Sequence, residues 1–159
     1  MKVILTGHKE IDRVLKALPK ELQHSIQQQA HVDAAKPLIE KEKLLAPEGP
    51  TGNLVDSIGA VKIPLRRANF IGEVHVGPRR GRRYRGHHAH LVEFGTKLRK
   101  LKGKGKYPAG TKRGVMPAKP FVRPALQQTK DIVLARIQNS TAKKLVAKMR
   151  RELKGSFIR

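Results

Sequence analysis

The stretch from His87 to Leu126 constrains the fold of this chain more than any other part of the sequence. It contains a short apolar and acidic segment, residues 91–94, which ends at Gly95. A lysine- and glycine-rich tract follows and is too polar to pack in a core. Three prolines between residues 117 and 124 then fix φ and disfavour helix just before them. This pattern predicts a scaffold that presents a long basic loop.

Composition predicts one domain over residues 1–159, with a modest aliphatic core, because 38% of the residues are hydrophobic and none is Trp. The chain has no Cys, which excludes disulfides and thiolate metal sites. No apolar run approaches the roughly 20 residues of a membrane span. Residues 1–5 are too short for the apolar part of a signal peptide. We therefore expect a soluble protein, made in the cytoplasm, with no membrane partner and no small-molecule substrate.

The charge is extreme and unevenly distributed. The chain has 35 Lys and Arg against 12 Asp and Glu, a formal net charge of +23. Such a surface attracts polyanions or acidic protein faces and repels copies of itself. About half of this charge lies between residues 79 and 113, where Glu93 is the single acid. The basic residues there are Arg79, Arg80, Arg82, Arg83, Arg85, Lys97, Arg99, Lys100, Lys102, Lys104, Lys106, Lys112 and Arg113.

Apolar spacing predicts helices in the first third of the chain. Residues 3–5 are β-prone and predict a short strand. Residues 11–18 have helical spacing up to Pro19, which suits the first position of a second helix. Pro37 is expected to kink or restart that helix. The apolar residues that recur every four positions in it are Leu22, Ile26 and Ala30.

The middle of the chain predicts a small antiparallel hairpin. Residues 46–50 read as a loop, and Thr51 is expected to cap the turn that follows. Alternation over residues 61–65 predicts a strand at a sheet edge, because Pro64 lacks a ladder donor. Residues 70–77 predict the partner strand.

In the last third, residues 89–94 could form a helix or a strand, and a helical turn is favoured. A helix is predicted from Phe121, with a break at 139–141. Residues 141–159 are expected to form a peripheral helix or a tail. The residues expected in the core are Leu91, Val92, Phe94, Phe121, Val122 and Leu126. The fold class is therefore α+β, a small antiparallel sheet flanked by N-terminal and C-terminal helices, with long basic loops at 79–88 and 97–115.

Three segments, in this order, resemble the motifs of one family. Residues 46–58 contain Thr-Gly-Asn-Leu-Val-Asp-Ser-Ile, residues 89–96 read Ala-His-Leu-Val-Glu-Phe-Gly-Thr, and residues 117–126 read Pro-Ala-Lys-Pro-Phe-Val-Arg-Pro-Ala-Leu. The chain resembles the small head–tail joining or tail-completion (neck) proteins of long-tailed bacteriophages. The resemblance covers roughly residues 3 to 138, and the basic loops and strong positive charge depart from the family pattern.

The resemblance implies a non-enzymatic protein of the virion neck, assembled in the cytoplasm of the bacterial host. It implies a homo-oligomeric ring, with six subunits favoured over twelve, that completes the tail or joins it to the DNA-filled head. The implied partners are head-side connector proteins and tail proteins. The basic loops and the positive charge, which depart from the family pattern, suggest an added contact with packaged DNA. The resemblance supplies no catalytic residues. The alternative is a sequence-independent nucleic-acid-binding protein.

Two further interpretations compete with these, a metal site and a metal-dependent nuclease. His87, His88, His90 and Glu93 have side chains that suit Zn or Mn, but on a helix they would not converge. Glu93 is instead expected to neutralise nearby Arg or Lys. A metal-dependent nuclease needs clustered carboxylates, and the acids of this chain are scattered. Glu40 and Glu42 are expected on a solvated helix face. We therefore predict no enzyme, no metal and no cofactor.

The two basic loops are the candidate interaction sites. Arginine binds phosphate through a bidentate fork, and Tyr84 has a ring that could stack on a base or on an arginine. Such binding would be independent of sequence and weaken steeply with salt. A solvated loop, or a contact with an acidic neighbouring subunit, is the competing interpretation. The candidates are Arg79, Arg80, Arg82, Arg83, Tyr84, Arg85, Lys97, Arg99, Lys100, Lys102, Lys104 and Lys106.

Overall fold

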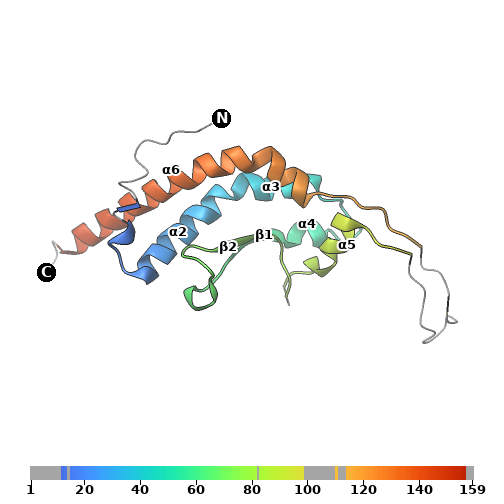
Figure 1. The fold of residues 1–159 in the computed structure, drawn as a ribbon, viewed down its shortest axis with the longest axis horizontal. Helices are drawn as coiled ribbons and strands as arrows, with labels where there is room; N and C mark the ends of the chain where they lie inside the picture. The colour runs from blue at the N-terminus through green and yellow to red at the C-terminus, as the bar shows by residue number, and fades with distance from the viewer. Residues whose placement is uncertain (1–11, 14, 82, 99–109, 111–113, 157–159) are drawn as a thin grey trace. The chain divides into compact units, whose positions relative to one another are not determined.

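The computed structural model describes residues 12–13, 15–81, 83–98, 110 and 114–156 of the chain (Figure 1). Contacts divide the chain into two compact units. Unit 1 comprises Met1–Leu38, Ala60–Val76 and Thr129–Arg159, and unit 2 comprises Ile39–Gly59 and Gly77–Gln128. The predicted single domain over 1–159 stays a prediction. The strand expected at residues 3–5 and most of the loop 97–115 lie outside the described residues.

The fold is α+β, as the sequence predicts, with helices and a two-stranded antiparallel sheet. Its α-helices are α2 (Lys20–Ala34), α3 (Lys36–Leu45), α4 (Asn53–Ser57), α5 (Ala89–Phe94) and α6 (Val122–Ser156). The strands are β1 (Ile58–Lys62) and β2 (Val74–Pro78), and the short 3-10 helices are η1 (Leu65–Arg67) and η2 (Gly86–His88). The described residues 12–13 and 15–16 are also helical. No helix in the described part of the chain is long and apolar enough to span a membrane.

Prolines set the boundaries of the first helices. Pro19 lies directly before α2 with an extended ψ of 144°, one position earlier than predicted. The α2 helix ends at Ala34, and the chain restarts as α3 with Pro37 as its second residue. Proline has no N–H to donate, and the first turn of a helix does not require one. The restart predicted at Pro37 is therefore confirmed.

The sheet begins earlier than the alternation at 61–65 indicates. The first two residues of β1, Ile58 and Gly59, are buried, whereas Val61 is 41% exposed. The chain leaves the strand before Pro64 and enters η1, so the expected bounds 61–65 of this strand are wrong. Thr51 does not cap α4. Gly52 holds the N-cap position with φ of +61°, and Asn53 donates to the Thr51 hydroxyl.

The apolar core of unit 1 joins three segments that are distant in sequence. Leu15, Ile26 and Leu145 are buried together, and Leu18 and Leu22 pack against them. Leu145 belongs to α6, so the C-terminal helix contributes to this core. Lys144, the preceding residue, pairs with Asp33 of α2 at 2.8 Å.

Polar side chains of α2 hold the connection between β1 and β2, all within unit 1. His24 accepts from the N–H of Gly72 at 2.9 Å and lies 2.8 Å from the carbonyl of Ile63. Gln28 donates to the carbonyls of Ile63 and Glu73 at 2.6 and 3.0 Å. Buried backbone groups need such partners. The apolar periodicity of α2 does not reveal them.

The α6 helix is continuous through residues 139–141, so the predicted break is wrong (Figure 1). The Thr141 hydroxyl donates to the carbonyl of Ile137 within the helix at 2.7 Å, which satisfies it without ending the helix. The buried face of α6 includes Ala125, Thr129, Thr141 and Leu145, which follow one another at multiples of four residues. Leu126, expected in the core, is 50% exposed.

Candidate functional site

The three segments that carry the resemblance meet in the core of unit 2. Its buried residues come from 46–58 (Ala46, Leu54 and Ile58), from 89–96 (Ala89) and from 117–126 (Phe121). Phe121 is fully buried. The three motif segments therefore form the apolar core of unit 2 together.

The short helix α5 determines which of its residues enter this core. Ala89, Val92 and Glu93 share one face at helical spacing, with Ala89 in the core and Val92 packed against it. Phe94 falls outside that face and is 70% exposed, so its expected place in the core is wrong. Leu91 is half-buried.

Glu93 caps the N-terminus of α6. One carboxylate oxygen accepts from the N–H groups of Phe121 and Val122 at 2.7 and 3.0 Å, and the other accepts from Arg123 at 3.2 Å. The first N–H groups of a helix have no partner within it. A negative charge there also interacts favourably with the helix dipole.

The lowered pKa of Glu93 is consistent with these three hydrogen bonds. Burial acts to raise the pKa of this carboxyl, but the three amide hydrogen bonds together outweigh burial, and the pKa lies below its ordinary value. Attraction to Arg123 is the smallest of the contributions. Glu93 therefore acts chiefly as a helix cap, and the expectation that it neutralises nearby Arg or Lys describes a minor part of its role.

A sequence signal for this cap exists. Residues 117–120 precede α6 and include no Ser, Thr, Asp or Asn that could cap it locally. A helix start without its own cap needs an acceptor from elsewhere in the chain. The sequence does not tell which of the scattered acids supplies it.

Backbone pairing closes the base of the basic loop 97–115. The N–H of Thr96 donates to the carbonyl of Met116 at 2.9 Å, and the Thr96 hydroxyl accepts from the Met116 N–H at 3.0 Å. Gly95 has φ of +71°, and a Cβ there would lie 2.8 Å from the Ala118 nitrogen. No other residue fits this crossing without a backbone shift.

The side chain of Arg79 is fixed by contacts with two backbone carbonyls and with Tyr84. Its Nε donates to the carbonyl of Ser57 at 2.9 Å, and an Nη donates to the carbonyl of Asp56 at 3.4 Å. Its guanidinium lies 3.6 Å from the centre of the Tyr84 ring. A Cβ at Gly59 would lie 2.8 Å from the Arg79 guanidinium carbon, so a larger residue there would displace this side chain from its present position.

The remaining candidate residues differ in exposure. Arg80 and Arg85 face each other in an antiparallel bridge, and Arg80, Arg83, Arg85 and Lys97 are exposed. The other candidates lie outside the described residues; they are Arg82, Arg99, Lys100, Lys102, Lys104 and Lys106.

Glu42 is a titratable group that is buried, contrary to the expectation from its sequence. It is only 1% exposed, whereas a solvated helix face was expected, and its Oε2 has no hydrogen-bond partner among the residues that the structure describes. Burial, with a smaller contribution from the negative charge of Glu93, raises the pKa of the Glu42 carboxyl to about 7. Glu40, two residues earlier on α3, is exposed as expected. Glu42 has a lysine on either side of it in the sequence, and this pattern predicts a solvated position, although the side chain is buried.

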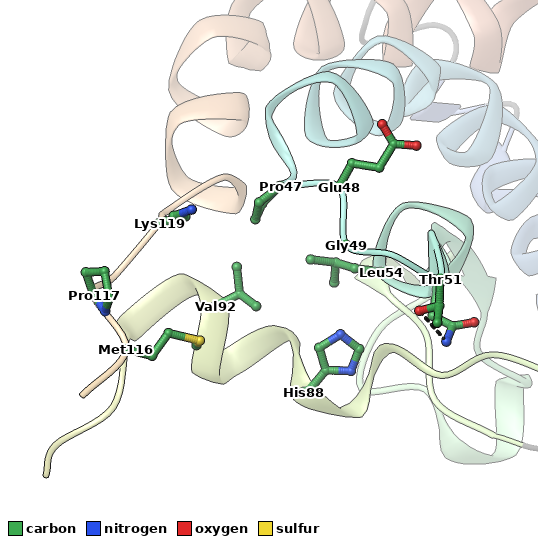
Figure 2. A pocket seen from close by; sticks show the side chains of 11 residues that line it. Pro47, Glu48, Gly49, Thr51, Leu54, His88, Val92, Met116, Pro117 and Lys119 are labelled. Carbon is green, nitrogen blue, oxygen red and sulfur yellow. Dashed lines mark hydrogen bonds between the residues drawn. The ribbon is translucent and has the colours of Figure 1, made fainter. Parts of the chain in front are cut away.

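Unit 2 also contains an apolar cavity of about 360 Å³. Figure 2 shows Val92 and Met116 on one side of it and Pro47 and Leu54 on the other. His88 lines it as well. Within the described residues, no three His, Asp or Glu side chains are grouped in a way that could hold a metal ion. Both oxygens of Glu93 are occupied by helix amides.

Comparisons of this chain with protein-family models, with curated proteins and with solved structures each gave no match.

Proposed function

We propose that this chain is a non-enzymatic structural protein of the neck of a tailed bacteriophage. It is assembled in the cytoplasm of the bacterial host and becomes part of the virion. It forms a homo-oligomeric ring that completes the tail or joins it to the DNA-filled head, beside head-side connector and tail proteins. Its basic loops face packaged DNA or acidic neighbouring subunits.

One observation carries this proposal: the three motif segments share a core. Residues 46–58, 89–96 and 117–126 are separated in the sequence and contribute to the same core. Ile58, Ala89 and Phe121 come from different segments and pack in one cluster. Glu93 of the second motif caps the helix that begins in the third. This convergence supports the resemblance as a structural one.

Exposed apolar side chains support protein contacts. They lie on both segments that flank residues 99–113, and a neighbouring subunit or tail protein would cover them. Their exposed fractions are 70% for Phe94, 50% for Leu98, 62% for Val115 and 37% for Met116. Interface cores are enriched in Phe and Met relative to the rest of the surface.

The charge of the chain supplies a test of ring formation. A ring multiplies +23 by its number of subunits, and the repulsion opposes closure. Salt or a polyanion should therefore promote rings. Electron microscopy and mass measurement of the purified chain, at low salt, at high salt and with a short polyanion, would show this. Rings that form equally in all three conditions would contradict the charge argument, and monomers in all three would count against a self-assembling ring.

The second candidate is a sequence-independent nucleic-acid-binding protein. The exposure of Arg80, Arg83 and Arg85 favours it. A tight, salt-sensitive complex with bare DNA, together with absence of the chain from purified virions, would select this candidate over the neck protein.

A further inference from the structure

We propose that Arg80, Arg83 and Arg85 form a preorganised site for the phosphate backbone of double-stranded DNA. They belong to the arginine hairpin, which we define as residues 79–81 and 83–85. This inference deepens the proposed function, on which it rests for the source of the DNA. It assigns different roles to arginines that composition alone treats as equivalent.

The backbone of the arginine hairpin is fixed by hydrogen bonds. The N–H of Tyr84 donates to the carbonyl of Gly81 at 3.2 Å, and the N–H of Gly86 donates to the carbonyl of Arg79 at 3.1 Å. The Arg79 N–H donates to the carbonyl of Ser57 at 3.0 Å, which ties the hairpin to the end of α4. Gly81 has φ of +142°, a conformation that glycine adopts without strain.

Arg79 has a positioning role. Its guanidinium is bound to the carbonyls of Ser57 and Asp56 and covers the ring of Tyr84. Arg79 and one face of the Tyr84 ring are therefore in contact with each other. Tyr84 stacks on an arginine, one of the two partners expected from sequence, and this face of its ring is not open to a base.

The bridge between Arg80 and Arg85 places two positive charges opposite each other. Residues paired in an antiparallel bridge have side chains on the same side, with Cβ atoms about 5 Å apart. Like charges in this position destabilise a strand pair. Neither arginine, nor Arg83, forms an ion pair with a carboxylate among the residues that the structure describes. An external anion would remove this repulsion.

The side chains of the hairpin favour phosphate over a protein face. Apart from Gly81 and Tyr84, every residue from 79 to 85 is arginine. A protein interface usually has apolar or aromatic anchors in its centre. Here Arg79 covers one face of the Tyr84 ring, so that face cannot serve as such an anchor, and Arg80, Arg83 and Arg85 are exposed. Guanidinium forks match phosphate oxygens in bidentate geometry.

A matched pair of double variants tests this assignment. The first is Arg80→Gln with Arg85→Gln. The control is Arg66→Gln with Arg67→Gln, which removes the same charge from two exposed arginines of η1. Binding of the full chain to a 20-base-pair duplex of arbitrary sequence is measured by fluorescence anisotropy at several salt concentrations. Circular dichroism checks that both variants fold, as we expect because all four side chains are exposed.

We expect the hairpin variant to bind duplex about tenfold or more weakly, and the control about threefold or less. The slope of log affinity against log salt should fall by about 1.8 in the hairpin variant, since two phosphate contacts are lost. Equal losses in the two variants would overturn the site, because general charge would then explain the binding. A hairpin variant that loses binding to poly-glutamate but keeps binding to duplex would also overturn it, in favour of an acidic protein partner.

The same variants separate this inference from the neck proposal. A chain that assembles in virions but shows equal losses in the two variants would overturn the hairpin assignment alone. A chain that binds duplex through the hairpin but is absent from virions would support the hairpin and overturn the neck proposal.

Discussion

A carboxylate oxygen of Glu93 accepts a hydrogen bond from the backbone N–H of Phe121 at 2.7 Å. The contact joins α5 to the start of α6 across 28 positions of sequence. It also connects the two motif segments on either side of the basic loop. Glu93 and Phe121 are both buried, so the cap and the apolar core of unit 2 form at the same place.

Replacement of Glu93 should destabilise the protein. We expect Glu93→Gln to lower the free energy of unfolding by roughly 2 kcal/mol, because one charge and at least one acceptor for the α6 amides are lost. Glu48→Gln, at an exposed acid of unit 2, is the control and should be nearly neutral. Urea denaturation at pH 7 measures both. Equal stability of the two variants would contradict the capping role.

The effect of Glu93 should also depend on pH. Its pKa is lowered in the folded chain, so its contribution is present at neutral pH and is lost as the pH falls through the folded pKa. The difference in stability between the native chain and Glu93→Gln should therefore shrink in acid, below the ordinary glutamate pKa of 4.5. A difference that stays constant down to pH 3 would show that the charge of Glu93 is not what stabilises α6.

Glu42 should have the opposite pH dependence. Its pKa is raised from 4.5 to about 7, so the folded chain binds the proton more tightly than the unfolded chain does. The contribution of Glu42 to stability is therefore greatest below pH 4.5 and is lost as the pH rises to about 7, by at most about 3 kcal/mol. We expect Glu42→Gln to raise the melting temperature at pH 8 and to leave it nearly unchanged at pH 4.

The control for this prediction is Glu40→Gln, in the same helix at an exposed position. It should change the melting temperature little at either pH. If Glu42→Gln destabilises the protein at pH 8, the ionised carboxylate has a favourable partner, and the buried, unpartnered state of Oε2 would be wrong.

Gly95 provides a test of backbone packing. Gly95→Ala introduces a Cβ 2.8 Å from backbone atoms of Met116 and Ala118, at φ of +71°. Gly114 is the matched control, because it has nearly the same φ, +72°, and open space around it. We expect Gly114→Ala to cost about 1 kcal/mol from backbone strain alone, and Gly95→Ala to cost about 3 kcal/mol. Thermal denaturation would measure both, and equal costs would contradict the close crossing.

The C-terminal part of α6 should be needed for stability. Leu145 is 4% exposed in the core of unit 1, and we expect Leu145→Ala to cost about 3 kcal/mol. Val146, the next residue, is 47% exposed, and Val146→Ala should cost less than about 0.5 kcal/mol. Chemical denaturation would compare them. If both variants lost similarly little stability, residues 141–159 would be a peripheral tail that does not contribute to the core.

The sequence predicts the elements of this fold better than their contacts. Periodicity and proline positions give α2, the restart at Pro37 and the helical turn of α5. The continuity of α6 was missed because Ser140 and Thr141 resemble a break, whereas the Thr141 hydroxyl bonds within the helix. The bounds of β1 were predicted too late in the chain, because the alternation over 61–65 continues past Lys62, where the strand ends.

The parts of the site that escaped prediction depend on long-range contacts. Glu42 lies among lysines in sequence, and only the packed unit shows that it is buried. The arginine run predicts a basic site but cannot separate Arg79, which binds the carbonyl of Ser57, from Arg80 and Arg85, which are exposed. Such distinctions require partners more than 20 residues away in the chain.

The most direct test of the neck proposal is electron microscopy of a lysate from phage that lack the gene for this chain, beside a lysate complemented with the intact gene. We predict full heads lying beside free tails of normal length if the chain joins the two, or abnormally long tails if it completes the tail. Complementation should restore joined particles. Intact, joined particles in the absence of the chain would contradict the account and favour a nucleic-acid-binding role.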